Sequence, residues 1–111
     1  MEIIIRERNS IPVIDIIGEV DLYNAKEIKD TIENIIKSGK YQIILNLQKV
    51  PFMDSSGIGT LVTGMYRLKK YHGSLKIINT VGSVAKVFKM TGMDSHLEIY
   101  DDEDSALKSF Q

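Results

Sequence analysis

The chain contains no cysteine, and only two prolines and two histidines, among its 111 residues. Without cysteine it can form no disulfide, no thiolate nucleophile and no cysteine-based zinc or iron–sulfur site, which fits a reducing compartment. No stretch approaches the roughly 18 to 20 apolar residues of a membrane-spanning helix. The first residues, three isoleucines after an acidic residue, are unlike a secretory signal. These absences predict a cytoplasmic protein, complete in one piece, with no membrane partner.

The chain also has no excess of charge of one sign. It contains 14 Lys and Arg residues and 15 Asp and Glu residues, so its formal net charge is -1. Nucleic-acid binding through phosphate contacts requires clustered Lys and Arg, so no nucleic-acid partner is expected. With 43% hydrophobic and 26% charged residues, the composition is that of one soluble globular domain, predicted to span residues 1–111. No metal, cofactor or second domain is needed to explain its folding.

Hydrophobic periodicity predicts strands at residues 2–8, 11–18, 41–47, 75–78 and 97–100. The first two are isoleucine-rich and are separated by Asn9-Ser10, a turn-forming pair that favours a β-hairpin. The run at 41–47 is apolar almost throughout, as expected of a central strand that is covered on both faces.

Helical stripes of apolar residues fall between these strands. The stripes comprise Ala25, Ile28, Ile32, Ile35 and Ile36 before Gly39; Ile58, Leu61, Val62, Met65 and Leu68, running to about His72 before Gly73; Val81, Val84, Ala85 and Phe88, ending near Gly92; and Ala106, Leu107 and Phe110. The predicted order is therefore ββαβαβαβα. Since strands alternate with helices after the hairpin, we expect an α/β fold with a mostly parallel central sheet and helices packed on it.

The segment Asp54-Ser55-Ser56-Gly57-Ile58-Gly59 leads from the predicted central strand into a helix. Asp and Ser oxygens accept the free amide protons of a first helical turn. Each glycine costs the helix about 1 kcal/mol relative to alanine, which suggests that something approaches the backbone closely. Two interpretations stay open. Asp54 or Ser55 caps a tightly packed helix, or an exposed seryl hydroxyl accepts a phosphate that the helix dipole favours.

A second polar segment, residues 18–24, joins the hairpin to the first helix. Functional loops of open parallel sheets gather beyond the carboxyl ends of the strands, so this loop and Asp54-Ser55 are expected at one edge if their strands are neighbours. Asp21 or Asn24 could cap the first helix, or the loop could bind a partner. Both alternatives stay open.

Motifs of enzyme chemistry are incomplete. Val62 stands where a dinucleotide-binding fingerprint needs its third glycine, and no Gly-Lys-Ser/Thr sequence exists for a P-loop. Neither Ser55, which has Met53 two residues before it, nor Ser56 has both flanking glycines of a nucleophile elbow. His72 and His96 are predicted at helix or loop ends and give no triad geometry. We therefore expect no enzyme and rank a hydrolase that uses Ser55 last.

Four segments resemble bacterial anti-sigma-factor antagonists of the STAS-domain family. They are Gly18-Glu19-Val20-Asp21, Leu45-Asn46-Leu47, Phe52 to Gly59, and Phe88-Lys89-Met90-Thr91-Gly92-Met93. The resemblance covers nearly the whole chain and implies a STAS-like domain. It also implies a switch protein that binds an anti-sigma factor, itself a GHKL-type serine kinase, so that the sigma factor is released and transcription is activated.

The resemblance further implies that the kinase phosphorylates the first hydroxyl residue after the motif aspartate, here Ser55, and that a PP2C-type serine phosphatase reverses the reaction. The implied partner-binding residues are Asp21, Tyr23, Asn24, Asp54, Ser55, Ser56, Gly57 and Ile58. Two features depart from the commoner pattern, namely Met93 in place of leucine and the bulky Leu22-Tyr23-Asn24. A STAS scaffold subunit of a stress-signalling assembly is the alternative function.

The effect of a phosphate can be stated from charge alone. It would bring about two negative charges beside Asp54 and near Asp21. Like charges facing a desolvated interface cost several kcal/mol, so we expect phosphorylation to switch partner binding off.

Overall fold

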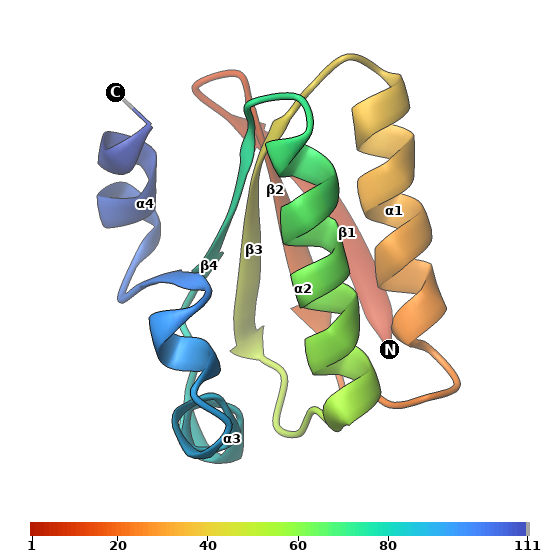
Figure 1. The fold of residues 1–111 in the computed structure, drawn as a ribbon, viewed down its shortest axis with the longest axis vertical. Coiled ribbons are helices and arrows are strands. Elements are labelled where there is room, and N and C mark those ends of the chain that lie inside the picture. The colour runs from red at the N-terminus through yellow and green to blue at the C-terminus, as the bar shows by residue number, and fades with distance from the viewer. Residues whose placement is uncertain (111) are drawn as a thin grey trace.

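A computed structural model describes residues 1–110 (Figure 1). The strands are β1 (Glu2–Arg8), β2 (Ile11–Ile17), β3 (Gln42–Lys49), β4 (Ser74–Ile78) and β5 (Glu98–Tyr100). The helices are α1 (Ala25–Lys37), α2 (Ser55–Lys69), α3 (Gly82–Met90) and α4 (Glu103–Ser109), with a 3₁₀ turn, η1 (Met93–Ser95), between α3 and β5. The predicted order of strands and helices is confirmed.

The strands form one sheet in the order β1-β2-β3-β4-β5. Only β1 and β2 are antiparallel, and all other neighbours are parallel. Asn9 and Ser10 have φ values of 54° and 66°, as a two-residue hairpin loop with two left-handed positions requires. The predicted N-terminal hairpin and mostly parallel sheet are therefore both present.

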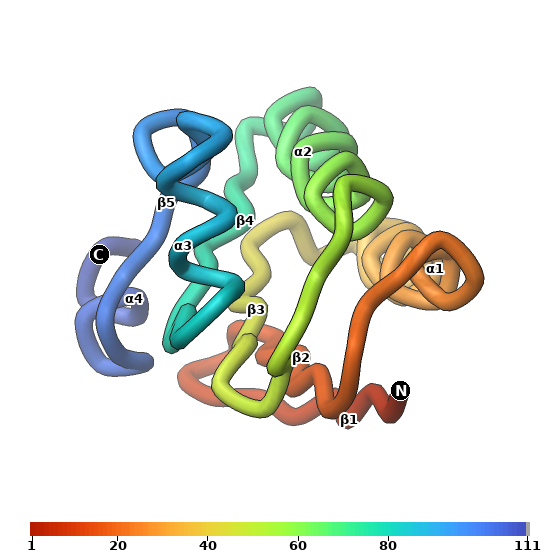
Figure 2. The backbone as a smooth tube through the Cα atoms, turned by 90° about the horizontal axis from the view of Figure 1, so that it is seen from below, coloured from red at the N-terminus to blue at the C-terminus, as the bar shows by residue number. Residues whose placement is uncertain are grey.

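Helices cover the two faces of the sheet unequally (Figure 2). The helices α1, α2 and α3 enclose the main core with one face, and α4 packs a smaller core against the other. β3 supplies Ile43 and Leu45 to the main core and Ile44 to the smaller one. Because alternate side chains of this strand are buried on opposite faces, its centre from Ile43 to Leu45 is continuously apolar.

Ion pairs fasten α4 to the hairpin. Arg6 of β1 donates hydrogen bonds to Asp15 at 2.7 Å and to Glu103 of α4 at 2.5 Å. Arg8 binds Glu103 at 2.8 Å. These guanidinium groups, Arg6 first, lower the pKa of the Glu103 carboxyl. The last helix is thus held by charge as well as by its small apolar core.

Two helix boundaries differ from the prediction. Val81 precedes α3 as its N-cap, with an extended backbone and an exposed side chain, so its predicted place in the buried stripe is wrong. The helix begins at Gly82, which orients Val84 and Phe88 toward the core. α2 ends at Lys69 rather than near His72, which has a φ of 60°. His72 therefore belongs to the turn before β4.

Candidate functional site

The loops that follow β2 and β3 are joined at the carboxyl edge of the sheet. Val20 and Met53 form an isolated parallel bridge beyond the two strands. The Val20 amide donates to the Phe52 carbonyl at 3.0 Å, and the Asp54 amide donates to the Val20 carbonyl at 3.1 Å. The Ser83 hydroxyl in the first turn of α3 donates to the Pro51 carbonyl at 2.6 Å. Figure 2 shows this edge from below.

Asp54 is the residue that caps α2. Its Oδ1 atom accepts hydrogen bonds from the backbone amides of Ser56 at 2.9 Å and Gly57 at 3.2 Å. Its Oδ2 atom accepts one from the Leu22 amide at 3.2 Å. One carboxylate therefore satisfies the first turn of the helix and fixes the neighbouring loop.

Ser55 is the first residue of α2 and is exposed. Within residues 1–110 its hydroxyl makes no hydrogen bond, because Asp54 already performs the capping role. Ser56 is half-buried and donates its amide to Asp54. Of the two adjacent hydroxyl groups, that of Ser55 is consequently the more accessible, at a helix terminus that favours added negative charge.

Asp21 and Asn24 shape the loop before α1. Asp21 Oδ1 accepts from the amides of Tyr23 at 2.9 Å and Asn24 at 3.1 Å. In return, Asn24 Oδ1 accepts from the Asp21 amide at 2.9 Å. The Asn24 side chain thus bonds backward into the loop rather than capping the helix. This arrangement holds the backbone on both sides of Tyr23, whose side chain is 91% exposed.

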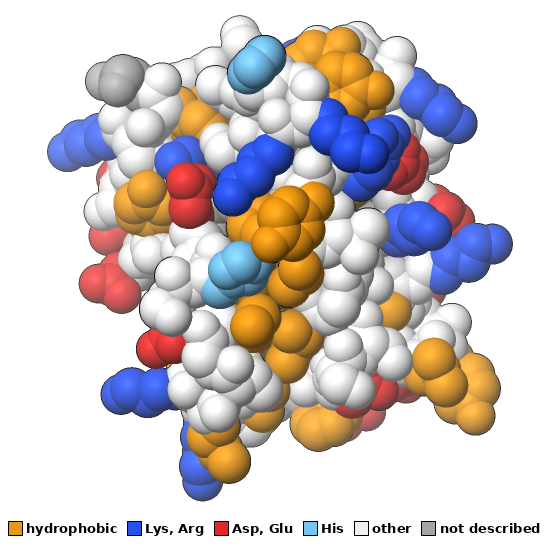
Figure 3. Space-filling view, in the orientation of Figure 1, with side chains coloured by type: hydrophobic (Ala, Val, Ile, Leu, Met, Phe, Trp, Pro, Cys, Tyr) orange, Lys and Arg blue, Asp and Glu red, His pale blue; other side chains and the backbone are white. Residues whose placement is uncertain are grey.

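Exposed apolar side chains surround this edge. We define the apolar rim as Leu22, Tyr23, Phe52 and Val81. Leu22 is 69% exposed, although large apolar side chains are usually covered. In Figure 3, hydrophobic side chains lie along the lower margin, where α2 begins. A rim of this kind is typical of a protein-binding surface.

The sequence predicts Tyr23 as a partner-binding residue and marks the bulky Leu22 beside it, but it does not predict that Phe52 and Val81 are exposed. The available signal was their position, since each is an apolar residue in a connection between a strand and a helix. Such residues are easily assigned to the core by hydrophobicity alone.

Gly57 and Ile58 face inward, unlike the rest of the predicted partner-binding set. A Cβ atom on Gly57 would lie 2.5 Å from Met53 Cγ and 2.9 Å from Val20 Cγ1. Ile58 belongs to the main core. The close approach expected at Gly57 is therefore made by this chain itself, and these two residues do not contribute to the exposed surface. Around Gly59 the space is open.

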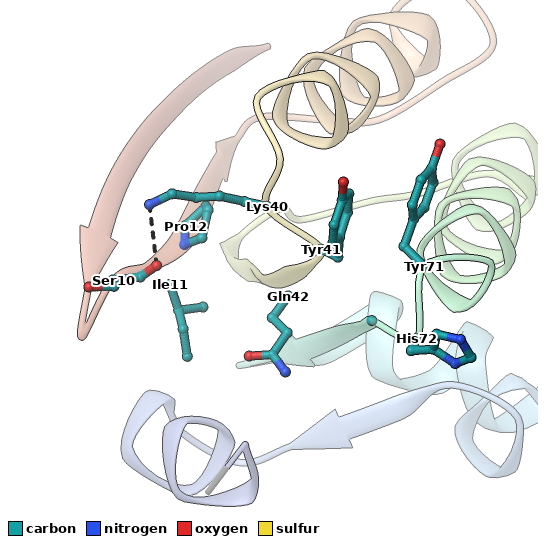
Figure 4. A pocket seen from close by; sticks show the side chains of 9 residues that line it. Ser10, Ile11, Pro12, Lys40, Tyr41, Gln42, Tyr71 and His72 are labelled. Carbon is teal, nitrogen blue, oxygen red and sulfur yellow. Dashed lines mark hydrogen bonds between the residues drawn. The ribbon is translucent and has the colours of Figure 1, made fainter.

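Neither histidine lies near Ser55. His72 follows the far end of α2 and lines a hollow of about 310 Å³ at the amino edge of the sheet (Figure 4). His96 lies 3.2 Å from the hydroxyl of Tyr66, which is also in the second half of α2. At about 1.5 Å of rise per residue, Tyr66 lies about 16 Å along α2 from Ser55, and His72 lies beyond the end of that helix.

Two features are absent from residues 1–110. No group of three or more His, Asp or Glu side chains is placed to hold a metal ion. Among the same residues, no helix has the length and apolar character required to cross a membrane.

The antiparallel first pair, the otherwise parallel sheet and the helices on both faces define a small α/β domain with an elaborated loop edge. The chain belongs to the STAS domain family, whose profile matches residues 2–106. It is 30% identical over 86 residues to an anti-sigma-B factor antagonist of Bacillus subtilis (strain 168), and the aligned region covers 78% of each chain.

Solved structures share this fold. An anti-sigma factor antagonist from Mycobacterium paratuberculosis matches with a TM-score of 0.87 at 20% identity, over 97% of this chain and 92% of that one. The unphosphorylated form of the anti-sigma factor antagonist SpoIIAA matches at 24% identity, over 97% and 96% of the two chains, with a TM-score of 0.74. The phosphorylated form of Bacillus SpoIIAA gives the same TM-score at 26% identity, over 99% and 100%.

Proposed function

We propose that this chain is an anti-sigma-factor antagonist switched by phosphorylation of Ser55. In its unphosphorylated form it binds an anti-sigma factor and thereby frees the sigma factor, which activates transcription. The observation that carries the proposal is the Ser55 hydroxyl, which is exposed and has no hydrogen-bond partner within residues 1–110. It lies at the head of α2, beside the apolar rim.

The proposed partners follow from the family to which the chain belongs. The anti-sigma factor would be a GHKL-type serine kinase that transfers phosphate to Ser55, and a PP2C-type phosphatase would remove it. The names of the relatives, antagonists of anti-sigma factors, support the first partner. In this function the chain is a regulator in the cytoplasm rather than an enzyme.

The apolar rim accounts for binding in the unphosphorylated state. Burying Leu22, Tyr23 and Phe52 against a partner would remove apolar surface from water. Aromatic residues commonly contribute most of the binding energy in such surfaces. Because Asp21 and Asn24 fix the loop beforehand, little conformational entropy would be lost on binding.

A phosphate on Ser55 would add about two negative charges next to the Asp54 carboxylate. Asp54 is committed to three backbone amides, so it cannot rotate away. The combined charge would have to be desolvated on binding, which opposes association. The same phosphate would be tolerated by the fold, because it would point outward at the positive end of a helix dipole. That the unphosphorylated and the phosphorylated forms of SpoIIAA both match this fold supports such tolerance.

Two serine variants test the acceptor. We expect Ser55→Ala to accept no phosphate when incubated with ATP and the anti-sigma kinase of the same organism. Ser56→Ala should accept about one phosphate per chain, as the unmodified protein does. Intact-mass spectrometry with peptide mapping measures both. Phosphate on Ser55→Ala at the normal level would overturn the assignment.

A further inference from the structure

β1 is an edge strand that pairs with β2 alone among residues 1–110, so its outer side has no strand partner there. The edge strand on the other side of the sheet, β5, is only three residues long. Short edges are one way in which proteins avoid unwanted pairing. β1, with seven residues, presents a much longer row of backbone N–H and C=O groups to a possible added strand.

Three consecutive isoleucines occupy the middle of this edge. The side chains of Ile4 and Ile5 are 42% and 56% exposed. Because side chains alternate along a strand, Ile3 and Ile5 lie on the side of the main core and Ile4 lies on the side of α4. Ile3 packs against the main core, and Arg6, two residues after Ile4, contacts α4. The edge is therefore apolar on both faces.

A hollow lies beside these isoleucines on each face. On the α1 side it measures about 300 Å³ and is lined in part by Ile5, Pro12 and Ile35. On the α4 side it measures about 230 Å³ and is lined in part by Ile4 and Ile17. Side chains of an added strand would find space next to the exposed isoleucines.

The sequence of β1 complements itself when a second copy runs antiparallel. If the two-fold axis passes through Ile4, then Ile4 faces Ile4 of the other copy and Ile3 faces Ile5. Glu2 then faces Arg6, so opposite charges close both ends of the apolar centre. Moving the axis to Ile5 would place Ile4 opposite Arg6 and Ile3 opposite Glu7. A parallel copy in register would place like charges side by side.

We propose that β1 joins two copies of this chain through an isologous antiparallel β1–β1 contact centred on Ile4. Each copy adds its edge to the other, so that the two sheets become continuous and neither long edge remains free. The contact uses residues other than Ser55 and the apolar rim. The dimer is thus independent of the proposed switch and can be tested without the anti-sigma factor.

Sedimentation velocity of the full chain from micromolar to millimolar concentration tests the proposal. We expect a reversible rise from the monomer to the dimer mass. The Ile4→Lys variant should dissociate at least about tenfold more easily, because two lysines would face each other at the axis. Met90→Lys, which changes a side chain that is 75% exposed on α3, is the matched control and should dimerise normally.

A mixture of variants tests the register. Ile4→Lys and Ile4→Glu should each dimerise poorly, whereas their equimolar mixture should recover the dimer, because only the Ile4-centred pairing sets these two side chains opposite each other. Circular dichroism checks that each variant is folded. A chain that stays monomeric throughout, or a dimer that Ile4→Lys leaves intact, overturns the proposal. Failure of the mixture to recover dimerisation overturns the Ile4-centred contact.

Discussion

The amino and carboxyl edges of the sheet differ in whether their large side chains contact each other or are exposed to solvent. At the amino edge, Tyr41 and Tyr71 stack with their ring centroids 4.5 Å apart and their planes 6° apart (Figure 4). At the carboxyl edge, Tyr23 and Leu22 project into solvent from a loop that hydrogen bonds hold in place. The two tyrosine rings at the amino edge contact each other, whereas the Tyr23 ring and the Leu22 side chain at the carboxyl edge are exposed to solvent.

The helices reinforce this contrast. Near the amino edge, Arg67 of α2 donates two hydrogen bonds to Glu33 of α1, at 2.7 and 2.9 Å. Near the carboxyl edge, α2 begins with an exposed hydroxyl that bonds to nothing else in residues 1–110. The same helix is thus tied to α1 by an ion pair near one end and presents an exposed hydroxyl at the other.

Among the substitutions, replacing Tyr23 or Tyr41 by alanine gives the largest expected effect. Tyr23→Ala should weaken binding to the anti-sigma factor about thirtyfold, or about 2 kcal/mol. It should leave stability unchanged, since the side chain is almost fully exposed. Tyr41→Ala, the matched change at the amino edge, should lower stability through loss of the stack and leave affinity unaltered. Calorimetric titration and urea denaturation measure the two quantities. Unchanged affinity of Tyr23→Ala for the anti-sigma factor would contradict the proposed role of the carboxyl edge in partner binding.

Two glycines at the start of α2 give the next largest effect. Gly57→Ala should lower the free energy of unfolding by about 1 to 2 kcal/mol, because its Cβ would press on Met53 and Val20. Gly59→Ala should raise it by about 1 kcal/mol, because alanine favours the helix and the space there is open. Equal changes in the two denaturation curves would show that the packing around Gly57 is not what requires glycine.

The smallest effect, on the pH dependence of stability, is expected from replacing Glu33. The hydrogen bonds from Arg67 lower the pKa of this carboxyl from its ordinary value of 4.5. A lowered pKa in the folded state stabilises the protein above that ordinary value and ceases to do so as the pH falls through the folded-state value. Glu33→Gln should therefore be slightly less stable than the unmodified protein at neutral pH and equally stable in acid. Urea denaturation at pH 7 and pH 3 tests this, and a difference that grows in acid would contradict it.

Local chemistry predicted much of the fold. The hairpin followed from Asn9-Ser10, and a cap at Asp54 or Ser55 followed from their place between a strand and a helix, where the structure shows Asp54 in that role. Both depend on neighbours in sequence, where propensity and capping dominate. The prediction that Val81 belongs to the buried stripe of α3 was wrong, because an apolar residue before a glycine can equally be an exposed N-cap.

The meeting of the two polar loops at one edge was expected if β2 and β3 are neighbours, as they are, but individual side-chain contacts between distant residues could not be predicted from the sequence. Arg6 meets Glu103 across 97 positions, and Tyr41 meets Tyr71 only because their strands are neighbours. For the same reason, the inward role of Gly57 became visible only with the Val20–Met53 bridge in place. Of the site residues, Ser55 and its role as phosphate acceptor remain a prediction from the motif.

The most direct test compares the two states of one protein. The chain phosphorylated on Ser55, verified by mass, is titrated calorimetrically against the anti-sigma factor beside the unmodified chain. The account predicts roughly a hundredfold weaker binding of the phosphorylated form, with the cooperative unfolding transition retained in both. Equal affinities, or loss of that transition on phosphorylation, would contradict it.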